Sequence, residues 1–320
     1  MIESAVFQIT YKCNSECGFC LNSYWNNRNQ PELSFDEKKY IIYRLFESGI
    51  SQIIFSGGEP LADRNCAELI KFAFSLGLKA YVQTNGLLIT KDFLGKINNA
   101  ALIQVSLEGD EQIHNELTKG NFKRTVDSIK LIKSMGMAAM TNFTVTKKNM
   151  HCLESYIQFI EGLGVDIANF TRLYPAGRAL INYKALMPDK NEFVAFLKKL
   201  EGLKNKTNVQ LNIQGPTPLC MLKTNDINMG TNICAAGRTE ICVMPNGMIS
   251  LCPSWPEPFG TINDIDKITG INIRKRLPEK CHNCEDIESC GGACILACTK
   301  EGDIYSEAEI KKKLVGMAVR

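Results

Sequence analysis

The chain has 320 residues, enough to bury a large core and to form one barrel-sized domain with a smaller appendage. Hydrophobic residues make up 45%, charged residues 22%, and the formal net charge is only +3. This balance is ordinary for a globular protein and predicts no nucleic-acid or membrane partner. The sequence shows neither a signal peptide nor an apolar run of about 18 residues, so we expect a cytoplasmic protein without a transmembrane helix.

Short apolar runs alternate with amphipathic stretches through residues 5–203. Ser34, followed by Glu37 and an apolar run, predicts a capping box at the start of one helix. Glycines 49, 77, 136 and 164 predict helix ends. We expect strands at residues 5–10, 52–55, 79–84, 102–107, 138–145 and 167–172, and helices at residues 34–48, 65–76, 91–98, 122–135, 150–163 and 189–203.

Six alternating strand–helix units predict an α/β fold with a parallel sheet and right-handed crossovers. Six units, where a closed barrel has eight, favour an open, partial (β/α)6 barrel. Ligands of such sheets bind at the carboxyl ends of the strands, where residues 13–20, 56–60 and 84–86 are expected.

The alternation stops after residue 204. Two short strands, 240–244 and 248–252, flank Pro245-Asn246-Gly247, which is a strong hairpin signal. The segment that follows has little apolar periodicity and would need bound metal for stability. We therefore divide the chain into a barrel (1–214), a metal-rich domain (215–305) and a C-terminal helical tail (306–320).

Eleven of the fourteen cysteines follow one ordered spacing pattern. Cys13, Cys17 and Cys20 read C-x3-C-x2-C directly after the first strand, and three thiolates of this kind can hold three irons of a [4Fe–4S] cluster. Such short spacings, without an export signal, favour metal ligation over disulfides. A structural zinc knuckle is the alternative. The other eight are Cys220, Cys234, Cys252, Cys281, Cys284, Cys290, Cys294 and Cys298.

Polar and glycine-rich segments follow the next three strands: Ser56-Gly57-Gly58-Glu59-Pro60, Thr84-Asn85-Gly86 and Ser106-Leu107-Glu108-Gly109. Two glycines let a backbone approach a ligand closely, and the carboxylate beside them suits an amino group. Each segment could instead be a plain polar turn. Their expected position on one rim favours a binding site.

These motifs together resemble the radical S-adenosylmethionine (SAM) superfamily. The resemblance implies a [4Fe–4S] cluster on the first three cysteines, whose open iron binds the amino and carboxylate groups of SAM. It implies reductive cleavage of SAM to a 5′-deoxyadenosyl radical that abstracts a hydrogen atom. The residues implied in SAM binding are Phe19 near adenine, Gly57, Gly58, Glu59 and Pro60 at the methionyl amino end, and Asn85, Ser106 and Glu108 near ribose or carboxylate.

The C-terminal cysteines resemble the SPASM extension of this superfamily, which carries two auxiliary [4Fe–4S] clusters. Segment 175–178, Pro-Ala-Gly-Arg, also resembles SPASM proteins. The resemblance assigns Cys234, Cys252 and Cys294 to auxiliary cluster I, with Cys220, its rival Cys242 or an open position as fourth ligand. It assigns Cys281, Cys284, Cys290 and Cys298 to auxiliary cluster II. A multi-zinc domain is the alternative.

The chain departs from the family pattern in three places. Only three residues separate the last two cysteines of the pattern. Pro253 stands where the sulfatase-maturating branch has an aspartate, and the arginine frequent after His114 is missing, with Lys119, Lys123 or Arg124 as substitutes. No catalytic acid or base can be assigned. We expect Cys66 and Cys152 to be core thiols, and Tyr24 and Trp25 to line either the core or a substrate channel.

The resemblance implies an oxidoreductase that modifies a ribosomally synthesised peptide through a thioether or carbon–carbon crosslink. A flavodoxin- or ferredoxin-type protein would supply electrons. Because the chain starts almost at the first strand, we expect a separate leader-recognition protein or direct peptide binding. The alternatives are dehydrogenation of a carbohydrate or aminocyclitol alcohol, sulfatase maturation, and a non-catalytic iron–sulfur or zinc protein.

Overall fold

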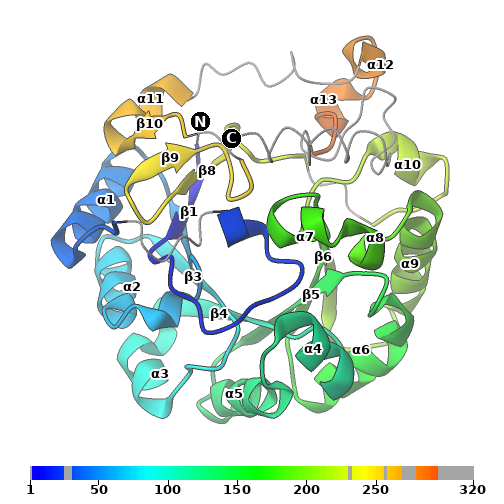
Figure 1. Cartoon of the computed structure of the whole chain (residues 1–320), viewed down its shortest axis with the longest axis horizontal. Helices are drawn as coiled ribbons and strands as arrows, with labels where there is room; N and C mark the ends of the chain where they lie inside the picture. Colours follow the sequence, from blue (N-terminus) through cyan, green and yellow to red (C-terminus); the bar gives the residue numbers. More distant parts are fainter. Residues whose placement is uncertain (1, 25–30, 230–232, 256–257, 269–278, 295–320) are drawn as a thin grey trace.

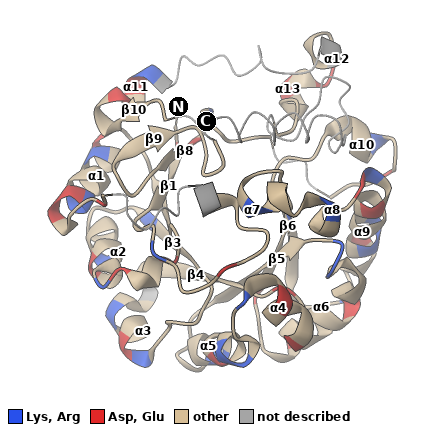
Figure 2. Ribbon diagram, in the orientation of Figure 1, with Lys and Arg blue, Asp and Glu red and all other residues tan. Residues whose placement is uncertain are grey.

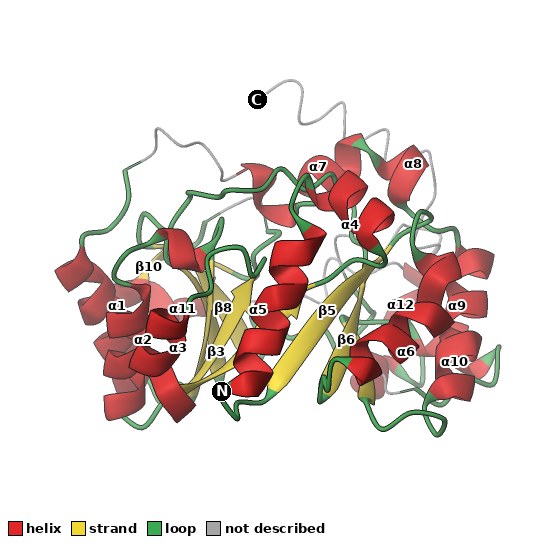
Figure 3. Cartoon of the chain, turned by 90° about the horizontal axis from the view of Figure 1, so that it is seen from below, coloured by secondary structure: helices red, strands yellow, loops and turns green. Residues whose placement is uncertain are grey.

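The computed structural model describes residues 2–24, 31–229, 233–255, 258–268 and 279–294. Its parallel strands form one curved layer, and helices cover the outer face of that layer (Figures 1 and 3). The parallel strands are β1 (Ser4–Gln8), β2 (Gln52–Ser56), β3 (Lys79–Thr84), β4 (Ala101–Ser106), β5 (Ala139–Val145), β6 (Ile167–Arg172) and β7 (Gln210–Gln214).

The long helices of the outer layer follow the strands as βα units require. Shorter helices α4, α7 and α8 lie at one end of the sheet, beyond the carboxyl ends of the strands (Figure 3). The α-helices are α1 (Phe35–Glu47), α2 (Cys66–Ser75), α3 (Lys91–Ile97), α4 (Glu111–Thr118), α5 (Phe122–Ser134), α6 (Leu153–Gly162), α7 (Gly177–Ile181), α8 (Tyr183–Leu186), α9 (Lys190–Leu203), α10 (Leu219–Lys223), α11 (Ile265–Ile268), α12 (Glu279–His282) and α13 (Ile287–Cys290). None of the helices in these described ranges is long and apolar enough to cross a membrane.

The predicted hairpin forms, and it joins the barrel sheet. Strand β8 (Glu240–Val243) pairs parallel with β1 and antiparallel with β9 (Met248–Ser250), and β10 (Gly260–Thr261) extends β9. The sheet order is β10-β9-β8-β1-β2-β3-β4-β5-β6-β7, so β7 and β10 are edges and the barrel is open. The partial barrel predicted from the sequence is therefore confirmed, while the division at residue 215 stays a prediction.

The six predicted strands and six predicted long helices are all present, with bounds shifted by a few residues. The capping box between Ser34 and Glu37 is confirmed, and the four predicted helix-ending glycines have positive φ angles. Strand β7 was missed because its five residues alternate polar and apolar too briefly to stand out. Helices α4, α7, α8 and α10 were missed because each has eight residues or fewer.

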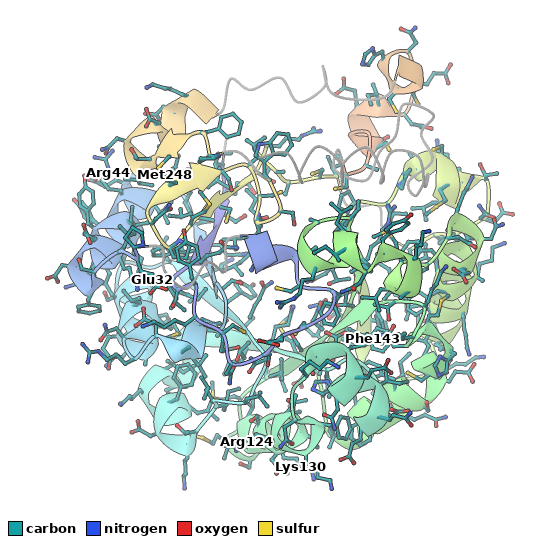
Figure 4. The ribbon with its side chains drawn as sticks, viewed as in Figure 1. Glu32, Arg44, Arg124, Lys130, Phe143 and Met248 are labelled. Carbon is teal, nitrogen blue, oxygen red and sulfur yellow. The ribbon has the colours of Figure 1, made fainter. Side chains whose placement is uncertain are left out.

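An aromatic cluster joins the sheet to its outer helices. Phe143 on β5 packs on Tyr156 of α6, with ring centroids 4.7 Å apart, and on Phe170 of β6 at 5.5 Å. Phe170 in turn contacts Phe196 of α9 at 5.9 Å. Figure 4 labels Phe143, which is fully buried. These contacts show that the odd-numbered residues of β5 and the even-numbered residues of β6 face the helices.

Replacing Phe143 with alanine should lower the free energy of unfolding by about 3–5 kcal/mol, because the change leaves a cavity between β5 and α6. Phe74→Ala is the control, since Phe74 is 57% exposed and its loss should change stability by no more than about 0.5 kcal/mol. Urea unfolding of both variants measures the difference. Equal losses in the two variants would contradict this description of the core.

Candidate functional site

The loop after β1 carries Cys13, Cys17 and Cys20, all partly exposed. Hydrogen bonds from Arg178 of α7 and from Asn182, which directly follows α7, hold the turn of this loop. The Arg178 Nε atom donates a hydrogen bond to the Cys17 carbonyl at 2.7 Å, and the Arg178 backbone N–H donates to the Cys20 carbonyl at 3.0 Å. Asn182 Nδ2 donates to the Gly18 carbonyl at 2.9 Å. The turn that spaces the thiols is thus fixed by side chains more than 150 residues away in sequence.

A second anchor of the loop is the end of α4. The Gly18 backbone N–H donates to the Leu117 carbonyl at 2.8 Å, and that of Glu16 donates to the Thr118 carbonyl at 3.3 Å. Because both sides of the loop are hydrogen-bonded to helices, the three cysteines are preorganised at the carboxyl ends of the strands.

The loop's surroundings disfavour free thiolates. Burial raises the pKa of Cys13 and raises that of Cys17 well above its usual value. Negative charge on Cys20 raises the pKa of both thiols further, and Arg178 partly opposes this effect. Since a bound metal deprotonates its thiol ligands outright, three neighbouring thiols of this kind fit a cationic cluster better than free acid–base chemistry.

The Gly57-Gly58 pair lies directly against the strand that leads into the cysteine loop. The Gly58 N–H donates to the Thr10 carbonyl at 2.8 Å, and the Glu59 N–H donates to the Lys12 carbonyl at 2.7 Å. A Cβ atom at Gly58 would lie 2.2 Å from the Lys12 carbonyl oxygen, and one at Gly57 would lie 2.5 Å from that of Thr10. Both glycines are therefore required for backbone-to-backbone contact, whether or not they also contact a ligand.

The Glu59 carboxylate points inward and joins two rim segments. It is 1% exposed, and its oxygens accept hydrogen bonds from Thr84 Oγ1 at 2.6 Å, Asn85 N at 2.8 Å and Leu61 N at 3.2 Å. Burial raises the Glu59 pKa to about 7, although these three donors oppose the shift. The side chain thus positions its neighbours, and the amino-group contact predicted for it stays a prediction. Pro60 follows it, buried, at the start of a short 3-10 helix.

Asn85 joins the rim segment that follows β3 to the cysteine loop. Its Nδ2 atom donates to Asn14 Oδ1 at 2.6 Å and to Ser15 Oγ at 3.3 Å, and its Oδ1 accepts from Leu87 N at 2.9 Å. The structure therefore brings Cys13–Cys20, Glu59 and Asn85 into one hydrogen-bonded rim.

Glu108 is fully buried, and its contacts are structural. Its carboxylate accepts from Thr144 N at 2.6 Å and from Thr144 Oγ1 at 3.3 Å, while its backbone N–H donates to His114 Nδ1 at 3.2 Å. Burial raises the Glu108 pKa to about 8 and lowers that of His114 to about 4. His114 is therefore a neutral acceptor. Ser106, two residues earlier, is half-buried at the end of β4.

Three further predicted residues are described. Phe19 is half-buried and packs on the hydrophobic core beside the loop. Arg124, one of three candidate substitutes for the missing arginine, donates through Nε and Nη2 to the carbonyls of Leu87 and Ile89, so it shapes the loop after β3. Lys123 pairs with Glu111 at 3.6 Å on the surface.

In the C-terminal part, Cys234, Cys252 and Cys294 come close to one another. Burial raises the pKa of Cys234 to about 11 and of Cys252 to about 12, and the charge of Cys294 adds to both shifts. Cys242, the rival fourth ligand, is fully buried on β8, and its pKa is raised by burial and by Cys252.

The exposed Cys220 lies on α10, which contacts the other cysteine group. The Leu219 N–H donates to Cys290 Sγ at 3.3 Å, and Lys223 pairs with Asp286 at 2.5 Å. Cys284 and Cys281 are adjacent through a backbone hydrogen bond of 3.4 Å. Figure 1 shows α10 and α13 on the same side of the molecule.

The remaining predicted residues lie either outside the described part of the chain or in the core. Cys298, Trp25 and the tail 306–320 lie outside the described residues. Cys66 and Cys152 are buried, as predicted. Within the described ranges, no three His, Cys, Asp or Glu side chains meet closely enough to hold a single metal ion. The ligands of an iron–sulfur cluster bind different irons and need not meet at one point.

Arg178, Asn182 and Asn14 are site residues that the sequence did not reveal. Segment 175–178 was noticed, but nothing in it indicated contact with the cysteine loop. Asn14 lies inside the cysteine motif at a position that the spacing leaves free, and only its contact with Asn85 reveals it.

The family comparison agrees with this geometry. A profile described as "Radical SAM superfamily" matches residues 7–160, which contain the cysteine loop and the three rim segments. This match covers a little under half of the chain and makes it similar to the radical SAM superfamily of enzymes, a family that implies a [4Fe–4S] cluster and SAM. The donor set and the preorganised loop described above fit that cluster.

Among curated proteins, the chain is similar to two named PqqA peptide cyclase. It is 28% identical over 220 residues to that of Bradyrhizobium diazoefficiens and 26% identical over 254 residues to that of Rhodopseudomonas palustris. The matches cover 67% and 78% of this chain, but 58% and 66% of the relatives, so the chain spans less than two thirds of their lengths.

Among solved structures, the fold is similar to Streptococcus suis SuiB bound to its precursor peptide SuiA, with TM-score 0.75, 17% identity and coverage of 95% of this chain and 74% of SuiB. It is also similar to anSMEcpe with bound AdoMet and the Kp18Cys peptide, with TM-score 0.74, 17% identity and coverage of 100% and 97%. At these identities the likeness concerns the fold.

Glu108 should make the stability of the protein depend on pH. Because its pKa is raised to about 8 in the folded state, the folded protein holds a proton that the unfolded chain releases at lower pH. Its contribution is present in full below the unfolded pKa and is lost as pH rises through about 8. Glu108→Gln should therefore flatten the decline in the free energy of unfolding between about pH 5 and pH 8. Anaerobic urea titrations of both proteins test this, and identical slopes would contradict it.

Proposed function

We propose that this chain is a radical SAM oxidoreductase that modifies a peptide. The observation that carries the proposal is the hydrogen-bonded rim in which Glu59 and Asn85 fix the cysteine loop beside the glycine pair. When bound there, the cluster and SAM supply a 5′-deoxyadenosyl radical that takes a hydrogen atom from the substrate.

The residues of the chain would bind and aim this group. Cys13, Cys17 and Cys20 would ligate three irons and leave one position for SAM. The backbone around Gly57 and Gly58, the segment 84–86 and Ser106 would surround SAM, with Phe19 beside its flat ring. Glu59 and Glu108, both buried in hydrogen bonds, would hold these segments in place. Rigid support of this kind keeps a reactive centre directed at one substrate atom.

A peptide substrate is supported by the comparisons. The curated relatives are named as cyclases of a peptide, and two structures of similar fold contain bound peptides. Oxidation of such a peptide would form a thioether or carbon–carbon bond. A flavodoxin- or ferredoxin-type protein would deliver electrons, and the peptide would be presented by a separate leader-recognition protein or bound directly by this chain.

We also propose two auxiliary [4Fe–4S] clusters in a SPASM domain at residues 215–305. The closeness of Cys234, Cys252 and Cys294 supports their assignment to one cluster. Cys281, Cys284, Cys290 and Cys298 would hold the other. Leu219, the neighbour of Cys220, donates a hydrogen bond to Cys290 of the second group, and this favours Cys242 over Cys220 as the fourth ligand of the first cluster.

Iron analysis and SAM cleavage test the clusters. Anaerobically reconstituted protein should hold about twelve irons per chain with matching sulfide, and Cys13→Ala/Cys17→Ala/Cys20→Ala should hold about eight. Dithionite and SAM should yield 5′-deoxyadenosine with the wild type and none with the triple variant. Cys66→Ala, a core thiol, is the control and should keep both iron and cleavage. Zinc in place of iron, or cleavage by the triple variant, would overturn the proposal.

Deuterium transfer tests the substrate. Candidate substrate peptides, made in deuterated form, should transfer deuterium to 5′-deoxyadenosine and lose mass through crosslinking. Transfer from a deuterated cyclitol and from none of the peptides would replace the peptide by an alcohol substrate.

A further inference from the structure

Toward the carboxyl ends of strands β4–β7 the inner face is polar, where a closed barrel would be apolar. Since Phe143 and Phe170 face the helices, the alternate residues of β5 and β6 face inward. The strand register places these inner residues beside one another on neighbouring strands. We define the amide wall as Gln104, Asn142, Asn169, Thr171, Asn212 and Gln214.

The amide wall is held in shape by its own hydrogen bonds. Asn169 Nδ2 donates to Gln104 Oε1 at 2.8 Å, and Asn212 Nδ2 donates to Asn169 Oδ1 at 3.3 Å. One layer nearer the rim, Thr171 Oγ1 lies 2.5 Å from Asn142 Oδ1 and 3.3 Å from Gln214 Oε1. The hydroxyl can donate to only one of these two oxygens at a time.

The rim layer keeps hydrogen-bonding capacity for a ligand. Each carboxamide offers two N–H donors and two acceptor sites, and the contacts above use only part of them. Asn142, Thr171 and Gln214 are each only half-buried. Across the sheet, Gln8 on β1 faces the same side, because it pairs with Ser56. Its Nε2 atom is buried and makes no hydrogen bond to the described residues. An unsatisfied buried donor of this kind indicates an absent partner.

None of the inner-face residues of β4–β7, which the structure describes completely, carries a charge. Figure 2 shows lysine, arginine, aspartate and glutamate concentrated on the outer helices. The Glu108 carboxylate, which accepts hydrogen bonds from the inner-face residue Thr144, is fully buried. A charged group held against this face would lose hydration without gaining an ion pair from it, which disfavours its binding.

Branched apolar side chains fill the interior of closed (β/α)8 barrels. Amides in that place cost stability unless they serve a ligand or bind water. We propose that the amide wall binds an uncharged, hydrogen-bonding part of the substrate, a segment of peptide backbone with neutral side chains. This inference rests on the proposed function and specifies its substrate class.

Calorimetric titration of the reconstituted, SAM-loaded protein under anaerobic conditions tests the inference. The probes are the blocked tripeptide amides acetyl-Ser-Asn-Gly, acetyl-Ser-Lys-Gly and acetyl-Ser-Asp-Gly, together with myo-inositol as a neutral polyol. The neutral tripeptide should bind at least about tenfold tighter than either charged one, because a site built for neutral hydrogen bonds rejects a buried charge.

Two nearly isosteric substitutions test whether the amide wall binds the probes, because they change its hydrogen bonding with little change to the fold. Asn142→Asp should weaken the neutral tripeptide about tenfold and favour the lysine tripeptide, since it adds one negative charge. Thr171→Val should weaken the neutral tripeptide by removing the hydroxyl that orients Asn142. Asn121→Asp is the matched control, because Asn121 caps α5 on the surface and aspartate caps equally well. It should bind all probes as the wild type does.

The outcomes are distinct. Tighter binding of a charged tripeptide, unchanged affinities in Asn142→Asp and Thr171→Val, or no binding of any probe would overturn the inference. If only myo-inositol binds, and both variants weaken it, the amide wall binds a neutral ligand but the proposal that this ligand is a peptide is wrong. Wild-type SAM cleavage with dithionite, measured without any probe, reports on the proposed function separately.

Discussion

The buried Glu59 carboxylate is the interaction on which the rim depends. It accepts hydrogen bonds from the third strand segment at Thr84 and Asn85 while its own backbone is bonded to the residue before Cys13. Three strand ends are thereby joined through one residue. Removing a carboxylate with three donors would leave those donors unsatisfied in a buried place, which is why the segment is rigid.

The barrel has two chemically different faces. Its outer face is apolar and aromatic, and it binds the helices through contacts such as Phe143 with Tyr156. Its inner face becomes polar and uncharged toward the carboxyl ends of β4–β7. Because the open sheet leaves an edge at β7, the inner face is not sealed by an eighth unit, and the C-terminal cysteine segment lies on that side of the ring (Figure 1).

Much of this could be predicted from local patterns. The Ser34 capping box, the four terminal glycines and the Asn246-Gly247 turn each depend on neighbouring residues, so the sequence was sufficient for them. Short elements such as β7 and α7 were not predicted, because five residues show too little periodicity. The glycine pair was predicted to approach a ligand, and the structure adds that it approaches the backbone of Thr10 and Lys12.

The sequence by itself predicted the partial barrel and the rim that carries the site, because these follow from periodicity and spacing. Only the tertiary structure decided that Arg178 and Asn182 hold the cysteine turn, that Glu59 and Glu108 point inward, and that β8 joins the sheet beside β1. These depend on contacts between residues far apart in the chain, and no local pattern specifies which distant group will satisfy a given carbonyl, carboxylate or strand edge.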